Sequence, residues 1–160
     1  MVGQDVAFSG TCCALHGTTN TVLLMLMTWV PFGDSGKLAY EAHLTATSAA
    51  TLVWVLYMLA VSYKSSYAAM GTMLCCIVSF LCHCFAIVIF AIALAACGSN
   101  PECDGGLTWT GAKPAGYVYA GPRVEFIAYY CILCLSLLGD VVIGWLTYPV
   151  VNTFRIMKMD

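Results

Sequence analysis

Residues 75–97 read C-C-I-V-S-F-L-C-H-C-F-A-I-V-I-F-A-I-A-L-A-A-C, with no Asp, Glu, Lys or Arg among them. The apolar run extends back to Ala68, and a helix that crosses a bilayer needs about 20 mostly apolar residues. Residues 68–97 are therefore predicted to form a spanning helix that is long enough to tilt. Of the whole chain, 61% is hydrophobic and only 9% is charged, whereas soluble domains carry about 25% charged residues. We interpret the chain as an integral membrane protein.

Residues 44–63 and 124–151 are also apolar enough to span, whereas residues 6–30 form a weaker candidate. The second half of this weaker segment is apolar, but its first half holds His16 and Asn20. Side chains four residues apart share one helix face. We expect this polar face to pack inside a bundle. The alternative is an interfacial segment followed by a half-buried helix.

The four segments together predict an all-α integral membrane protein, folded as a four-span transmembrane helix bundle. A single domain would cover residues 1–160, with residues 98–123 as its longer loop and a tight turn around residues 64–66. Small residues such as Ala46 and Gly139 recur in the spans, and such residues allow membrane helices to approach closely. They would serve the packing of the chain's own helices, contacts with neighbouring subunits, or both.

Asp140 lies in the middle of the last predicted span, in the sequence L-L-G-D-V-V-I. A charged side chain at that depth costs about 3 kcal/mol on insertion scales, so it must be protonated, paired or facing a cavity. Counting along the helices from the long loop places His83 at the depth of Asp140, and His16 falls near the same level. We predict that these three residues form an intramembrane polar group.

Three roles for this group remain open from the sequence. Asp140 and His83 could form a buried hydrogen-bonded pair that fixes helix register, because polar side chains often link membrane helices. They could belong to a proton or ion path. In the third reading, His16 and His83 are the axial ligands of a b-type haem. Apart from that haem and structural lipids, no cofactor is expected.

The chain contains 10 cysteines, four of them within residues 75–84. Cys75 and Cys82 share a helix face but lie about 10.5 Å apart along the axis. Zinc binds thiolates at about 2.3 Å, so one straight helix cannot provide a closed zinc site from this run. Cys131 and Cys134 lie at a different predicted depth. We predict no metal site and interpret these thiols as packing residues.

Cys97 and Cys103 differ from the other cysteines because they flank G-S-N-P-E at the start of the long loop. A disulfide between them would close a short loop in an oxidising compartment. The sequence leaves this bridge as a possibility, since spacing alone does not establish disulfide geometry.

No catalytic motif is found in the sequence: it has no Gly-rich phosphate loop, no HExxH pair and no nucleophile with a base at motif spacing. Six basic residues scattered along the chain also argue against a nucleic-acid partner. We therefore predict a protein that is not an enzyme, and that has no evident soluble substrate. The leading prediction is a supernumerary accessory subunit of an energy-transducing, respiratory membrane complex. Its partners would be other integral membrane subunits and lipids, with the mitochondrial inner membrane as first choice and an endomembrane, the plasma membrane or the thylakoid as alternatives.

Three other functions remain open. The chain could be a proton- or ion-coupled transport subunit that uses Asp140 and His83, or a haem-binding electron-transfer subunit. It could also be an independent scaffold, because its four-span layout resembles that of claudin-like and MARVEL-like tetraspans. The resemblance is one of layout: claudin-like proteins carry a W-G-L-W-C-C-type signature in the first outer loop. Here G-G-L-T-W, at residues 105–109, lies in the predicted second outer loop.

Overall fold

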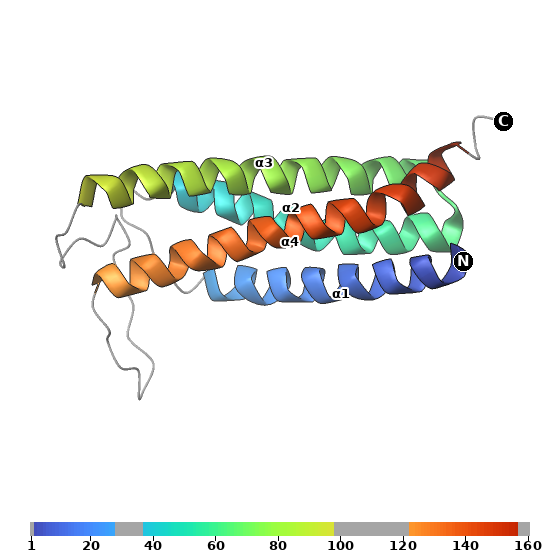
Figure 1. The fold of residues 1–160 in the computed structure, drawn as a ribbon. Coiled ribbons are helices and arrows are strands. Elements are labelled where there is room, and N and C mark those ends of the chain that lie inside the picture. The colour runs from blue at the N-terminus through green and yellow to red at the C-terminus, as the bar shows by residue number, and fades with distance from the viewer. Residues whose placement is uncertain (1, 28–36, 98–121, 157–160) are drawn as a thin grey trace.

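The computed structural model describes residues 2–27, 37–97 and 122–156. All of these residues except Lys64 and Ser65 lie in helices. The helices are α1 (Val2–Met27), α2 (Lys37–Tyr63), α3 (Ser66–Cys97) and α4 (Pro122–Ile156). They run along one another as an elongated bundle, and α1 begins and α4 ends at the end that holds the α2–α3 turn (Figure 1). The all-helical fold class is thus confirmed for the described part of the chain.

Three of the described helices are long and apolar enough to cross a membrane, namely the segments Leu38–Tyr63, Ser66–Ala93 and Ile127–Thr153. The predicted spans in α2, α3 and α4 overlap these segments. Within the described residues, α1 does not meet the same combination of length and hydropathy. Length and composition therefore indicate a membrane protein with three candidate spans.

Buried residues recur along the helices at alternating spacings of three and four, which is the period of left-handed helix bundles. In α2 this stripe contains Ala39, His43, Ala46, Ala50, Val53, Tyr57 and Ala60, with Thr47 and Ala49 buried beside it, and in α3 it contains Ala69, Thr72, Ser79, His83, Ala86 and Phe90. Most of these side chains are small or polar, so the helix backbones can approach closely. Large apolar side chains such as Leu81 and Leu135 point outward.

The turn predicted around residues 64–66 is confirmed, and its local bonds explain why it is so short. Lys64 adopts a left-handed conformation, with φ of 49°. The Ser65 amide donates a hydrogen bond to the Ala60 carbonyl at 3.2 Å, as in a Schellman motif that closes a helix. Ser65 Oγ then accepts a bond from the Ala68 amide at 3.3 Å, which caps α3. Two residues therefore end α2 and start α3.

The helix that contains the second predicted span, residues 44–63, extends further toward the N-terminus. α2 begins at Lys37, so His43 lies within the helix, and it is completely buried in the bundle. Hydropathy reports where a helix becomes apolar, not where its backbone hydrogen bonds begin. Lys37 and Glu41 lower the average over this first part of the helix, although Ala39 and His43 already belong to its buried face.

Two glycines set the distances between α1 and its neighbours. A Cβ at Gly17 would lie 2.9 Å from Trp54 Cβ in α2, and a Cβ at Gly139 would lie 2.9 Å from the His16 ring. Neither position could hold a side chain without a shift. Gly144, which the sequence also marks as a small residue in the last span, has nothing within 4 Å of the corresponding point.

Candidate functional site

Asp140 stands at the meeting point of three helices, and only 6% of it is exposed. Its Oδ1 lies 3.1 Å from His16 Nε2 in α1. Its Oδ2 lies 2.6 Å from His83 Nδ1 and accepts a hydrogen bond from Ser79 Oγ at 2.8 Å, both in α3. The structure thus brings together the three residues that the sequence singles out and adds Ser79. We call these four residues the carboxylate cluster.

The hydrogen-bond network assigns the protons of this cluster. When Asp140 is ionised, its oxygens can only accept, so His83 Nδ1–H and His16 Nε2–H are the donors. Asn20 Nδ2 lies 3.4 Å from His16 Nδ1, which is then an acceptor, and 3.2 Å from His16 Nε2. Asn20 Nδ2 also donates to the His16 carbonyl at 2.9 Å. Each histidine is therefore held in one tautomer by Asp140.

The cluster explains how an acid is accommodated inside an apolar bundle. A buried carboxylate is costly unless its oxygens are hydrogen-bonded or its charge is paired. Here both oxygens have donors, and protonation of either histidine would convert the contact into an ion pair. The arrangement can hold a proton among three side chains, and it links α1, α3 and α4 at a single level.

A second polar contact next to the cluster was missed by the sequence analysis. His43 Nδ1 forms a hydrogen bond with the Tyr129 hydroxyl, which joins α2 to α4. The His43 and His83 rings lie 5.3 Å apart between centroids. In the described part of the chain, His43 Nε2 and His83 Nε2 are buried atoms with no hydrogen-bond partner. All four helices therefore contribute to one polar region.

The sequence contains signals that could have found these residues. His43 continues the buried pattern of Ala46 and Ala50 toward the start of α2. Ser79 lies four residues before His83 and therefore on the same helix face. Tyr129 has the same relation to Leu133, which is fully buried. Extending the period of three and four beyond residue 44 would have placed His43 inside, and applying it within the other two spans would have placed Ser79 and Tyr129 inside.

The arrangement of the two histidines does not fit a haem held between α1 and α3. His16 and His83 both turn toward Asp140, and its carboxylate lies between their rings. Within the described helices, α1 and α3 are not direct neighbours, whereas both pack against α4. One nitrogen of each imidazole, His16 Nε2 and His83 Nδ1, is thus already hydrogen-bonded to the Asp140 carboxylate.

The cysteines of α3 do not gather into a site. Cys75, Cys76, Cys82 and Cys84 are each partly exposed, and Cys131 and Cys134 on α4 are exposed. Among the described residues, no group of three or more His, Cys, Asp or Glu side chains is placed to hold a metal ion. The possible disulfide between Cys97 and Cys103 lies outside the residues whose side chains are described.

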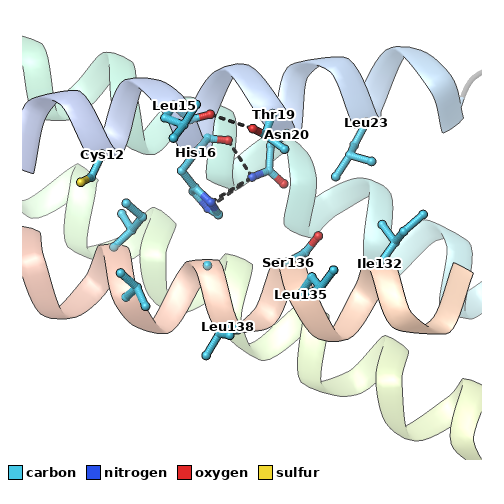
Figure 2. Close-up of a pocket in the computed structure, with 13 residues that line it drawn as sticks. Cys12, Leu15, His16, Thr19, Asn20, Leu23, Ile132, Leu135, Ser136 and Leu138 are labelled. Atoms are coloured by element: carbon cyan, nitrogen blue, oxygen red, sulfur yellow. Dashed lines mark hydrogen bonds between the residues drawn. The ribbon is translucent and has the colours of Figure 1, made fainter. Parts of the chain in front are cut away.

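A cavity of about 620 Å³ opens between α1 and α4, beside the carboxylate cluster. Figure 2 shows His16 and Asn20 projecting into it from α1 and Ser136 from α4. The remaining lining residues are Cys12, Leu15, Thr19, Leu23, Ile132, Leu135, Leu138, Gly139, Val142 and Ile143. The cavity is therefore largely apolar, with a few polar groups from both helices.

No protein-family model matches this sequence, and no curated protein or solved structure is significantly similar to it. Function is therefore inferred from the geometry of the bundle: a carboxylate cluster, a neighbouring histidine–tyrosine contact and a lateral apolar cavity.

Proposed function

We propose that the chain is a four-span membrane protein that serves as a non-catalytic accessory subunit of a larger membrane complex. The observation that carries this proposal is the pairing of Asp140, whose two oxygens accept hydrogen bonds from His16, His83 and Ser79. An acid whose oxygens are occupied by donors from its own chain is well suited to fixing helix register. Asp140 and its two histidine partners would thereby serve the architecture of the bundle.

The contacts of α1 support its assignment as the fourth span, within a single domain over residues 1–160. The helix has 26 residues, or about 39 Å at 1.5 Å per residue, which exceeds the roughly 30 Å of a hydrocarbon core. Two of its polar side chains face inward: Ser9 and Asn20 are 3% and 1% exposed, and Ser9 donates to the Leu146 carbonyl at 3.1 Å. Thr11 and Thr19 are exposed but donate to carbonyls of their own helix. Part of the polarity that weakens the hydropathy of α1 is thus placed inside the bundle.

The outer surface supports partners within the membrane. Large apolar side chains are exposed on every helix, for example Leu15, Leu52, Leu81 and Leu135. Such surfaces suit lipid tails and the helices of neighbouring subunits equally well. An energy-transducing, respiratory complex of the mitochondrial inner membrane is the proposed partner, and complexes of other membranes are the alternatives.

Extraction in a mild detergent, followed by native electrophoresis and mass spectrometry of the band, tests this proposal. We expect the chain to migrate at fixed stoichiometry with a large assembly, whose identity also names the membrane. A harsh detergent should release the chain and serves as the control for chance comigration. Migration alone, or as a small homo-oligomer, would overturn the accessory role and favour an independent scaffold.

A second candidate, proton- or ion-coupled transport, is favoured by one specific observation. Titratable side chains follow one another from Asp140 through His83 and His43 to Tyr129, and the two histidines each have an unpartnered Nε2 among the described residues. Intramembrane chains of this kind occur in proton relays.

Vesicles that contain the purified protein and a pH-sensitive dye test the transport candidate. If the candidate holds, an imposed potential drives proton flux that Asp140→Asn and His43→Leu abolish. Flux should survive in Ser48→Ala, a control in α2 whose hydroxyl donates to its own helix at the Leu44 carbonyl. Flux no greater than in empty vesicles rejects this candidate.

A further inference from the structure

Asn20 presents an unused hydrogen-bond acceptor to the cavity between α1 and α4. The residue is only 1% exposed, and its Oδ1 has no partner among the described residues. The orientation of the amide is fixed, because Nδ2 donates to the His16 carbonyl at 2.9 Å and an oxygen there would face another oxygen. Figure 2 shows the Asn20 oxygen directed toward the space between the two helices.

The walls around this acceptor define the rest of a ligand. Apolar side chains from both helices, including Leu15, Leu23, Ile132 and Leu135, line a volume of about 620 Å³. Sites for small molecules commonly occupy about 300–1,000 Å³ and combine apolar walls with a few polar groups. Ser136 adds a hydroxyl that points toward α1 (Figure 2). Ser136 is itself mostly buried, with 8% of the residue exposed.

We propose that this cavity binds an uncharged lipophilic alcohol or phenol, whose O–H donates to Asn20 Oδ1 and whose apolar body lies between α1 and α4. A buried acceptor without a partner is costly, and an O–H donor removes that cost. A ketone or ester of the same shape offers only acceptors and cannot do so. A phosphodiester headgroup would place a charge against apolar walls. This ligand site does not depend on the accessory-subunit function.

Two kinds of membrane molecule carry this chemistry, a sterol and a prenylated quinol. The experiment measures the affinity of the purified protein, in phosphatidylcholine nanodiscs, for matched pairs of ligands that differ in a hydroxyl or a carbonyl group. One pair is cholesterol and cholest-4-en-3-one, and the other is a short-chain ubiquinol and its quinone under anaerobic conditions. We expect the hydroxyl form of one pair to bind at least about fivefold more tightly than its carbonyl form. The pair that shows this preference identifies the source.

Three variants locate the site. Asn20→Leu should remove the preference for the hydroxyl form. Val142→Trp should fill the cavity and weaken binding of both forms. Val88→Trp, on an exposed position of α3 that does not line the cavity, should bind as the wild type does.

The outcomes separate cleanly. Equal binding of hydroxyl and carbonyl forms, absence of binding in both pairs, or a preference that persists in Asn20→Leu would each overturn the proposal. Equal binding would also identify the cavity as a crevice filled by bulk lipid. If Asn20→Leu does not fold, the ligand pairs on the wild type and the contrast between Val142→Trp and Val88→Trp still decide.

Discussion

Two regions of the bundle are held together by different forces. In the half next to the α2–α3 turn, which we call the apolar half, the core consists of Cys13, Val53, Tyr57, Ala60, Ala69, Ile143 and Val151. Near the middle of the bundle, the carboxylate cluster joins three helices through directed hydrogen bonds. A second apolar cluster, made of Ala39, Ala86, Phe90 and Leu133, lies toward the opposite end. The apolar half and the carboxylate cluster follow the same period of three and four along the helices. The two regions therefore share a packing geometry, but their interactions differ in how strongly they select one alignment of the helices.

This difference matters most for a protein surrounded by lipid. Lipid tails are as apolar as a leucine side chain, so burying apolar surface between helices gives little preference for one register. A repeating seam of small residues could pack nearly as well after a shift of one heptad. Asp140 can meet His16 and His83 in only one alignment of α1, α3 and α4. The apolar half thus supplies contact, and the carboxylate cluster supplies specificity.

The strongest way to break this comparison is Asp140→Ala. The substitution leaves the donors of His16, His83 and Ser79 without their acceptor, and breaking a buried charged pair costs roughly 3–5 kcal/mol. Unfolding in mixed micelles with increasing sodium dodecyl sulfate measures the loss. Asp140→Asn keeps the shape and one acceptor oxygen, so we expect a smaller loss. A change below about 1 kcal/mol for Asp140→Ala would show that the cluster does not hold the bundle.

A smaller loss is expected from Gly139→Ala, which perturbs the cluster without removing any of its polar atoms. The added Cβ would lie 2.9 Å from the His16 ring, so it would push that ring away from Asp140. Overpacking of this kind costs roughly 1–3 kcal/mol. Gly144→Ala in the same helix is the matched control, since nothing lies within 4 Å of its new atom. Equal unfolding midpoints for the two variants would contradict the close contact.

In the apolar half, Tyr57→Phe sharpens the comparison. Its hydroxyl donates to the Val6 carbonyl at 3.3 Å, while its ring fills the core. Removing one such bond costs about 0.5–1.5 kcal/mol, and the ring contacts persist. Tyr63→Phe, at a position that is 76% exposed, serves as the control. A loss as large as that of Asp140→Ala would mean that the apolar half also depends on directed bonds.

The smallest effects are expected at the partly exposed thiols of α3. Cys82→Ala and Cys84→Ala should each change the free energy of unfolding by no more than about 0.5 kcal/mol, as substitutions away from special features usually do. Cys13→Ala should cost more, because Cys13 is 1% exposed in the apolar half. A loss at Cys82 or Cys84 as large as that at Cys13 would contradict their partly exposed positions on α3.

The parts of the structure that were predictable from the sequence depend on rigid helix geometry. Asp140 is conspicuous within an apolar run, and a constant rise per residue allowed its depth to be compared with that of His83. His43 was missed because the low hydropathy of the preceding residues made the predicted span begin too late, at residue 44. Tyr129 and Ser79 lie within predicted spans, and only their helix-face relation to Leu133 and His83 could have indicated that they are buried. The cavity beside Asn20 arises from a gap between two helix surfaces, which no single segment encodes.

The two-residue turn at Lys64 and Ser65 has a consequence for biosynthesis. Because only two residues separate α2 from α3, we expect the two helices to enter the bilayer together as one helical hairpin. His83 would then be in the membrane before the ribosome has produced Asp140. Until that point, the Nδ1–H group of His83 would lack its carboxylate acceptor. Arrested nascent chains that end before α4 should be held by an insertion factor or chaperone, and chains that include Asp140 should be released. The carboxylate would thus mark completion of the fold.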